Sequence, residues 1–267
     1  MSSMSAPSSR YKLPPDAALA LVAVVVLALS APHGLLDKAD RAAYAVCHRL
    51  ADHSFVIGGR QLPLCARCSG TYLGAFAGLA VLTLRGRGKA GRFPSRPQLL
   101  VLAAFMVAWA IDGTNSFLAL MGWPHLYEPS NLLRLVTGTL EGVAIAAVLL
   151  PAVNLTLWRK PDPRRSIGNW RDLAWLLAGG GVIILAVSSE MDALLLPLAL
   201  LSGAMIPALL GVLNAMLYLA GIHREGCAER RREVVAPFLI GLALALVEIV
   251  LIGIAREALT ARFGLPF

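Results

Sequence analysis

The sequence is poor in charged residues. Only 15% of its 267 residues are Asp, Glu, Lys or Arg, whereas 57% are hydrophobic, and the mean hydropathy is +0.69. A soluble globular domain carries about 25% charged residues, so this composition excludes an ordinary soluble domain. The sequence therefore predicts a polytopic integral membrane protein.

The sequence also lacks the motifs of several common chemistries. Nothing in it resembles a nucleotide-binding glycine loop, a serine triad or a haem attachment site. The net charge is +8 and the pI is about 9.8, yet the basic residues lie in short loops between apolar runs and not along one amphipathic face. We therefore expect no nucleic-acid partner and interpret these residues as signals of membrane topology.

Apolar runs divide the chain into expected membrane spans, each close to the roughly 20 residues that a transmembrane helix needs. Seven such runs cover residues 17–36, 69–84, 98–120, 131–158, 173–188, 193–222 and 234–254. Pro197 and Pro207 allow the sixth run to be one kinked helix or two short ones. Because the runs lack the alternation of barrel strands, the expected fold is an all-α bundle of about seven transmembrane helices.

The N-terminal residues are assigned separately. Residues 1–16 contain Ser and Pro and are expected to be a mobile tail. Ala28-Leu29-Ser30 resembles a weak signal-peptidase site, so cleavage of residues 17–31 is an alternative to a first membrane helix.

Basic residues are concentrated in alternate loops. Three loops rich in Lys and Arg, at residues 85–96, 159–171 and 223–232, follow the second, fourth and sixth spans, whereas residues 122–130 and 188–192 contain none. The positive-inside rule then places the N-terminus and the three basic loops in the cytoplasm, for a multi-pass protein of the inner (plasma) membrane. Residues 33–67 are the exception, because this model places them outside although they contain five basic residues: Lys38, Arg41, Arg49, Arg60 and Arg67. Three aspartates partly offset this charge: Asp37, Asp40 and Asp52.

Three of the four cysteines form one motif in this extracytoplasmic loop. Cys47 and His48 are adjacent, and a Cys-x-x-Cys motif runs from Cys65 to Cys68. The two-residue spacer lets both thiolates turn toward one ion, so the set matches a tetrahedral metal site. Neighbouring residues diverge on a helix or strand, so His48 can join Cys47 as a ligand only from an irregular segment. The predicted ligands of zinc or another transition metal are Cys47, His48, Cys65 and Cys68.

Two other interpretations of these cysteines stay open. In one, Cys65 and Cys68 are a redox pair at a helix N-terminus, where the helix dipole and Arg67 would lower a thiol pKa, with Cys47 as the exchange partner. The protein would then be a membrane thiol–disulfide oxidoreductase that uses a quinone. In the other, a disulfide joins the loop to the second span and has no further role.

Polar residues within the expected spans form a second candidate site. Asn131, Arg134, Gly138 and Glu141 are spaced so that they share one helix face. A charge at membrane depth costs ~2.5 to 3.5 kcal/mol on insertion scales, so this face is expected to look inward. Asp112 of the third span is the expected partner of Arg134, either as a structural clamp or as part of a site.

This polar face supports further alternatives. Glu248 of the last span is within possible reach of Glu141, and two such carboxylates can relay protons or bind a cation. The favoured alternative is that each glutamate is neutral and hydrogen-bonded to a neighbour. In the redox interpretation, the quinone or another cofactor would bind Asn131, Arg134, Thr137 and Glu141, and the catalytic candidates are Cys65, Cys68, Arg67, Asp112 and Arg134. A third interpretation is a transporter or membrane assembly factor that binds its substrate on this face.

The second span carries a packing signal. Gly70, Gly74 and Gly78 recur every four residues and form a stripe that another helix can approach closely. The expected partners of the chain are the lipid bilayer, a second copy or another membrane protein, and a small-molecule substrate of unknown identity.

The motif residues resemble a known family. The segments Cys47-His48-Arg49, LPLCARCSGTYLG at residues 62–74, Asp112-Gly113 and SNLLRLVTG at residues 130–138 look like the hallmarks of DUF2085, a family of predicted prokaryotic membrane proteins defined as a domain of unknown function. The resemblance covers roughly residues 47–142 and departs at Ala51-Asp52-His53, where a Pro-Glu-Arg-like run is expected. It implies a helical membrane domain and no established activity. We assign this family-like domain to residues 17–157, and the apolar runs predict further membrane helices within residues 158–267.

Overall fold

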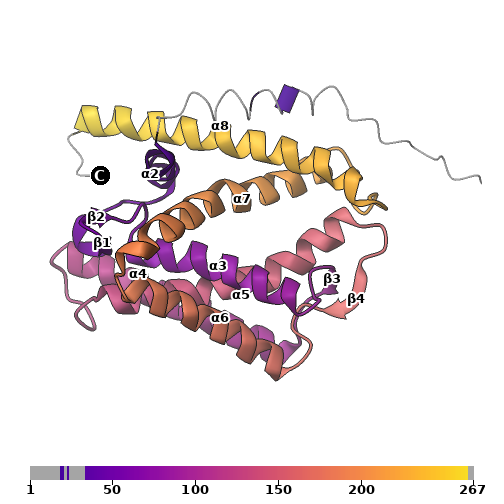
Figure 1. The fold of residues 1–267 in the computed structure, drawn as a ribbon, viewed down its shortest axis with the longest axis horizontal. Helices are drawn as coiled ribbons and strands as arrows, with labels where there is room; N and C mark the ends of the chain where they lie inside the picture. Colours follow the sequence, from indigo (N-terminus) through magenta and orange to yellow (C-terminus); the bar gives the residue numbers. More distant parts are fainter. Residues whose placement is uncertain (1–18, 21–22, 24–33, 264–267) are drawn as a thin grey trace, which may run out of the picture.

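The computed structural model describes residues 19–20, 23 and 34–263. Its main elements are helices, shown in Figure 1: α2 (Leu35–Val46), α3 (Ala66–Leu84), α4 (Arg96–Leu120), α5 (Asn131–Leu157), α6 (Trp170–Ser188), α7 (Leu195–Gly221) and α8 (Arg231–Phe263). Short elements fill the connections: β1 (Val56–Ile57) pairs antiparallel with β2 (Arg60–Gln61), β3 (Ala90–Arg92) pairs parallel with β4 (Asp162–Arg165), and 3-10 turns form at η1 (Ala51–His53) and η2 (Asp192–Leu194).

Five helical segments are long and apolar enough to cross a membrane. They are Arg96–Leu120, Asn131–Leu157, Trp170–Ser188, Asp192–Gly221 and Arg231–Phe263. These segments confirm the expected helical membrane fold. The expected second span is helix α3, which has 19 residues and is not among the five. The expected tail at residues 1–16 and nearly all of the expected first span lie outside the described residues.

The proline-containing sixth run forms a single helix. Helix α7 continues through Pro207, while Pro197 lies in its first turn, where a missing N–H breaks no helical hydrogen bond. The alternative of two short helices is therefore wrong. Helix α8 is longer than the expected seventh span and runs for 33 residues.

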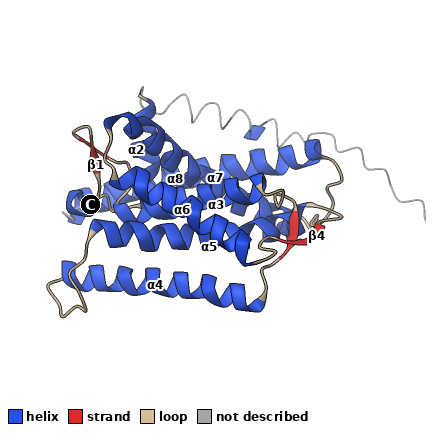
Figure 2. Cartoon of the chain, turned by 60° about the horizontal axis from the view of Figure 1, so that its bottom comes forward, coloured by secondary structure: helices blue, strands red, loops and turns tan. Residues whose placement is uncertain are grey.

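Helices α3 and α5 pack closely at the centre of the bundle (Figure 1). A Cβ atom added to Gly70 would lie 2.4 Å from the carbonyl oxygen of Leu135, so the backbones nearly touch. The glycine stripe predicted on α3 is therefore confirmed as a close contact. Its counterpart on α5 is Gly138 and Gly142, where an added Cβ would lie 2.1 Å from the carbonyl oxygens of Arg67 and Thr71. Figure 2 shows α4 alongside α5 at the edge of the bundle.

The expected loop at residues 33–67 contains structure that was not predicted. Helix α2 has 12 residues, about 18 Å at helical rise, too short to cross a bilayer of about 30 Å. It buries Ala39 and Ala43, and Ala39 contacts Gly203 of α7 so closely that a Cβ there would be 2.6 Å away. The spacing of these alanines by four residues was the available signal for a helix face.

The basic residues of this segment are largely ion-paired. Arg49 and Arg60 bind opposite oxygens of Asp40 at 2.6 and 2.8 Å, and Arg41 binds Glu257 of α8 at 2.8 Å. The cations that fit the positive-inside rule poorly are thus offset by carboxylates. The cysteine motif and the basic segment at residues 85–96 lie at opposite ends of α3.

Candidate functional site

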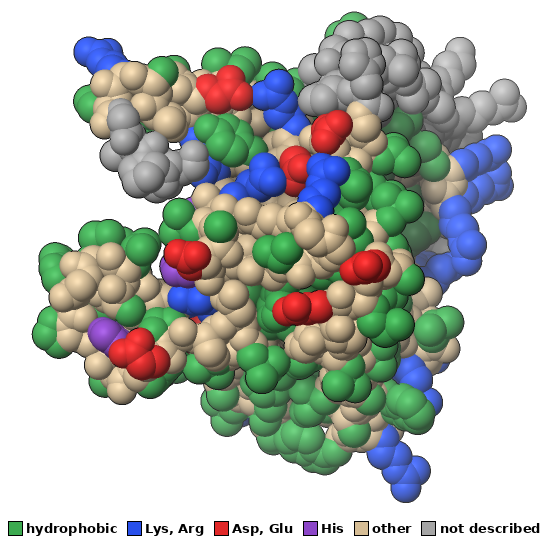
Figure 3. All heavy atoms as spheres, turned by 60° about the vertical axis from the view of Figure 1, so that its left-hand side comes forward, with side chains coloured by type: hydrophobic (Ala, Val, Ile, Leu, Met, Phe, Trp, Pro, Cys, Tyr) green, Lys and Arg blue, Asp and Glu red, His purple; other side chains and the backbone are tan. Residues whose placement is uncertain are grey.

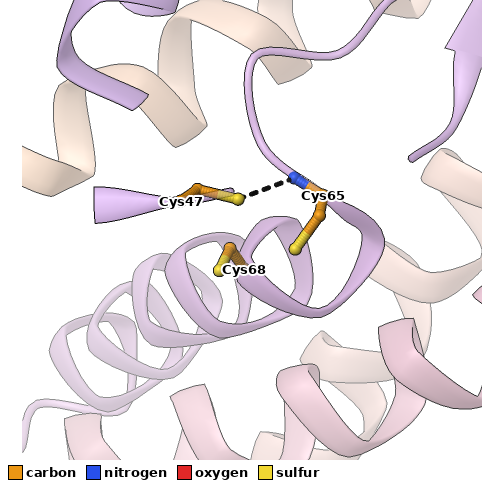
Figure 4. A group of neighbouring side chains, drawn as sticks. All are labelled: Cys47, Cys65 and Cys68. Atoms are coloured by element: carbon orange, nitrogen blue, oxygen red, sulfur yellow. Dashed lines mark hydrogen bonds between the residues drawn. The ribbon is translucent and has the colours of Figure 1, made fainter. Parts of the chain in front are cut away.

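The structure brings three of the four predicted metal ligands together. The sulfur atoms of Cys47, Cys65 and Cys68 all lie within 4.8 Å of one another (Figure 4). Cys47 follows the last residue of α2, Cys65 directly precedes α3, and Cys68 lies in the first turn of α3. The two-residue spacer spans most of that turn, which places Cys65 and Cys68 on one side of the helix.

The cluster is enclosed by apolar side chains. Cys47 and Cys65 are 5% and 2% exposed. Leu64, Ile206 of α7 and Ile249 of α8 pack around them. All four cysteines are free thiols in the structure, and Cys227 is exposed in the loop after α7. Cys47 and Cys65 are therefore shielded from water by helices that follow the motif in the chain, whereas Cys68 is half-buried.

Hydrogen bonds within the cluster stabilise a negative charge on the sulfur of Cys47. The backbone N–H of Cys65 donates to Sγ of Cys47 at 3.3 Å (Figure 4). Hydrogen bonds from the thiols of Cys65 and Cys68 hold the pKa of Cys47 well below its usual range. The same hydrogen bond to Cys47, together with burial, raises the pKa of Cys65. The cluster thus favours a single thiolate, at Cys47. Deprotonation of the second and third thiols would require a bound cation to offset their negative charge.

His48 lies next to this cluster but outside the group of three sulfurs. Its Nδ1 accepts the backbone N–H of Leu50 at 3.2 Å, and its ring packs edge-on against His53, with centroids 5.3 Å apart. Nδ1 is therefore engaged, which leaves Nε2 as the ring nitrogen that could bind a metal. The role of His48 as a ligand stays a prediction.

Arg256 of α8 holds the chain segment that carries Cys47. Its Nη1 donates to the carbonyl oxygen of Cys47 at 2.6 Å and also to that of Tyr44, and its Nη2 donates to that of His48 at 3.3 Å. Its guanidinium also lies over the Tyr44 ring, 4.2 Å from the centroid. The motif gave no indication of this residue, because Arg256 lies far along the chain. An arginine two residues past the expected end of the last span, at residue 254, was the available signal.

Asp112 pairs with Arg67 of the cysteine motif. Arg67 donates from Nε at 3.0 Å and from Nη2 at 2.5 Å to Oδ2 of Asp112, and Nη2 also reaches Ser116 at 2.8 Å. The hydroxyls of Tyr127 and Thr137 donate to the same carboxylate at 3.1 and 3.3 Å. Asp112 is 1% exposed, so this is a buried charge whose hydrogen bonds come from three helices or their connections.

The expected pairing of Asp112 with Arg134 is therefore wrong. Arg67, which lies on α3 where this helix packs closely against α5, occupies the carboxylate of Asp112 in place of Arg134. Arg134 instead donates from Nη1 to Oδ1 of Asn131 at 2.8 Å. Its Nε has no hydrogen-bond partner in the described part of the chain, although the residue is only 5% exposed.

The rest of the polar face of α5 looks inward, as predicted. Thr137 and Glu141 are each 6% exposed. The Thr71 hydroxyl donates to Glu141 at 2.7 Å, and Asn214 of α7 donates to Glu248 at 3.0 Å. Each glutamate is thus hydrogen-bonded to a neighbouring helix, as the favoured alternative predicted, and the two do not pair with each other.

The region that carries these residues matches known proteins. The sequence profile of a family described as a predicted membrane protein, DUF2085, matches residues 47–148. An uncharacterized protein of Methanothermobacter thermautotrophicus is 34% identical over 103 residues, which cover 39% of this chain and 83% of that protein. An uncharacterized protein of Methanocaldococcus jannaschii is 27% identical over 115 residues, which cover 43% of this chain and 68% of that protein. No solved structure matches the chain. The matched region spans the cysteine cluster and the polar residues of α3, α4 and α5, and the chain therefore belongs to the DUF2085 family of predicted membrane proteins.

Proposed function

We propose that this membrane protein binds a thiophilic transition metal ion, such as zinc, with Cys47, Cys65 and Cys68. The observation that carries the proposal is the convergence of three sulfurs within 4.8 Å of one another. Around one tetrahedral ion, with metal–sulfur bonds of about 2.3 Å, the sulfurs would be about 3.8 Å apart. A small closing movement of the side chains is enough to reach that geometry.

The chemistry of the cluster supports this assignment. Thiolates are soft ligands that select zinc, copper(I) and iron–sulfur centres over magnesium or calcium. The N-terminus of α3 stabilises negative charge on the cysteines there, and the N–H of Cys65 orients the Cys47 sulfur. Nε2 of His48 is the proposed fourth ligand. If it binds, the site is closed and structural; if it does not, the fourth position is open to a substrate.

The thiol–disulfide oxidoreductase remains the alternative. The lowered pKa of Cys47 supports it, since a thiolate is the reactive form of cysteine, and both other thiols lie within reach. A quinone or cofactor site on α5 has weaker support. Thr137 and Glu141 already bond to Asp112 and Thr71, as in a structural network between helices. The same bonds weaken the proposal of a transported substrate on this face.

We also propose that the cysteine cluster faces the extracytoplasmic side of the plasma membrane. It lies at the end of α3 opposite the basic residues that follow Leu84. The positive-inside rule places such basic connections in the cytoplasm. The ion pairs of Arg41, Arg49 and Arg60 support this orientation, because they neutralise basic residues at the cluster end.

Metal analysis combined with thiol counting tests the proposal. Protein purified in detergent without chelator is expected to hold about one metal ion per chain. After removal of the metal and denaturation, all four cysteines should react with a thiol reagent without prior reduction. A metal-free protein with one disulfide would contradict the metal site and favour the oxidoreductase.

A further inference from the structure

Arg134 is a buried cation without a counterion. It is 5% exposed, and no carboxylate pairs with it within the described residues. Only its Nη1 is bonded, to Oδ1 of Asn131 at 2.8 Å. Its Nε has no partner, and no described residue accepts a hydrogen bond from its Nη2. An unpaired buried charge is strongly unfavourable, so a counterion from outside the chain would be bound favourably here.

Asp112 does not supply this missing charge. Both Nε and Nη2 of Arg67 donate to its Oδ2, and Tyr127 donates to its Oδ1. The carboxylate of Asp112 is thus paired with the guanidinium of Arg67. The guanidinium of Arg134 has no carboxylate partner among the described residues. The net charge of this cluster of two arginines and one aspartate is positive.

Asn131, which accepts the hydrogen bond from Arg134, also contacts the segment around η1. The amide of Asn131 ties the start of α5 to η1, since its Nδ2 donates to the carbonyl oxygens of Asp52 and Ser54 at 3.2 and 3.4 Å. Between these two residues lies His53, which is half-buried. A neutral imidazole offers one ring N–H as a hydrogen-bond donor.

The surface at this end of the molecule is hollowed. Figure 3 shows the end that carries the start of α3 and α5, with a recess between two parts of the surface. Basic, histidine and acidic side chains are all visible in and beside this recess. A ligand that enters it would meet basic groups beside acidic ones.

We propose that Arg134 binds a small oxyanion, a carboxylate or phosphate group, at the start of α5. The guanidinium offers the adjacent pair Nε and Nη2, whose parallel N–H bonds match two oxygens of a planar carboxylate or a phosphate. Asn131 holds the opposite edge and so fixes the orientation of this pair. The inference goes beyond metal binding, since it rests on Arg134 and not on the cysteines.

The group can belong to a soluble anion or to an anionic lipid headgroup, because the recess opens at one end of a membrane bundle. Inorganic phosphate, acetate and phosphatidylglycerol are therefore the probes. Thermal unfolding of the full chain would be measured in phosphatidylcholine nanodiscs at constant ionic strength, with phosphate or acetate replacing chloride. In a second series, phosphatidylglycerol would replace part of the phosphatidylcholine.

Wild-type protein is expected to show a saturable rise in Tm with phosphate or acetate, or with phosphatidylglycerol if the ligand is a lipid. Arg134→Gln should abolish the rise, and Arg134→Lys should weaken binding at least tenfold, because an ammonium cannot bind two oxygens side by side. Arg41→Gln is the matched control. It removes the same charge from an exposed position at the same end of the bundle and should respond like wild type.

An equal rise in Tm for Arg134→Gln and wild type would overturn the inference. So would a wild-type Tm that is the same in chloride, phosphate and acetate and does not change with phosphatidylglycerol. Where Arg134→Gln does not fold, His53→Ala decides, since it removes only a half-buried donor: several-fold weaker binding supports the site, and unchanged binding overturns it. Metal content would be measured in the same samples. Bound metal without an anion response overturns this site alone, and an anion response without metal overturns only the proposed metal function.

Discussion

The backbone N–H of Cys65 donates to Sγ of Cys47 at 3.3 Å. This bond joins two residues that are 18 positions apart in the chain. Such N–H groups orient a thiolate ligand and tune its charge, which is the role of outer-shell partners in metal sites. The bond also places the positive end of α3 against the residue whose thiol pKa is lowest in the cluster, so charge and geometry agree at this point.

Serine substitution of either cysteine of the Cys-x-x-Cys motif should have the same effect. Cys65→Ser and Cys68→Ser are each expected to lose the bound metal, because each removes one of three thiolates. Metal per chain, measured on purified protein, checks this. Cys227→Ser is the control and should keep the metal, since Cys227 is exposed outside the cluster. If only Cys65 proves essential, a reactive nucleophile would explain the result better than a metal ligand.

Removing the charge of Asp112 should destabilise the protein strongly. Asp112→Asn leaves the partly buried Arg67 without a carboxylate, and breaking a buried ion pair usually costs about 3 to 5 kcal/mol. Denaturant unfolding in detergent measures the loss. Asp162→Asn is the matched control: its ion pair with Arg164 is solvent-accessible, so its loss should destabilise the protein far less. Equal stability of Asp112→Asn and wild type would show that the pair with Arg67 does not hold these helices.

The membrane spans were predictable from the sequence, because each span depends on the hydrophobicity of its own residues. Burial in a bilayer selects long apolar runs, so the expected boundaries at residues 98–120 and 131–158 differ from α4 and α5 by two residues or fewer. The close approach of α3 was also predictable, because its glycine stripe lies in one helix. Gly138 was expected on the inward face of α5, but its contact with α3, and that of Gly142, was not predicted, since pairing two helices requires knowledge of both faces.

Partners across helices were predicted less well. Membrane depth alone allows either Arg67 or Arg134 to reach Asp112, and the glycine contact decides for Arg67. The Cys-x-x-Cys spacing placed Cys65 and Cys68 correctly, whereas the position of Cys47 depends on helix α2 and on Arg256. Arg256 and nearly all of helix α2 lie outside the expected spans and outside the cysteine motif, so sequence spacing gave little information on their contacts.

Adding a methyl group to the centre of the bundle should separate α3 from α5. In Gly142→Ala the new Cβ would lie 2.1 Å from the carbonyl oxygen of Thr71, so the backbone must shift, at a cost of about 1 to 3 kcal/mol or more. Unfolding in detergent and protein abundance in the membrane are the measurements. Gly181→Ala is the control, since an added Cβ there meets nothing within 4 Å, and the change should be neutral or slightly stabilising. Unchanged stability of Gly142→Ala would contradict the close packing.

Loss of Arg256 should weaken metal binding although Arg256 contacts no sulfur in the cluster. Its guanidinium holds the carbonyl oxygens of Cys47 and His48, and with them the direction of the Cys47 side chain. Arg256→Gln is expected to lower metal affinity by about 10- to 100-fold, the usual effect of an outer-shell partner. Competition with a chelator measures this affinity. Arg262→Gln is the matched control, because Arg262 lies on the same helix, is exposed, and is expected to leave affinity unchanged. Equal affinities of both variants would mean that the Cys47 segment is held in place without α8.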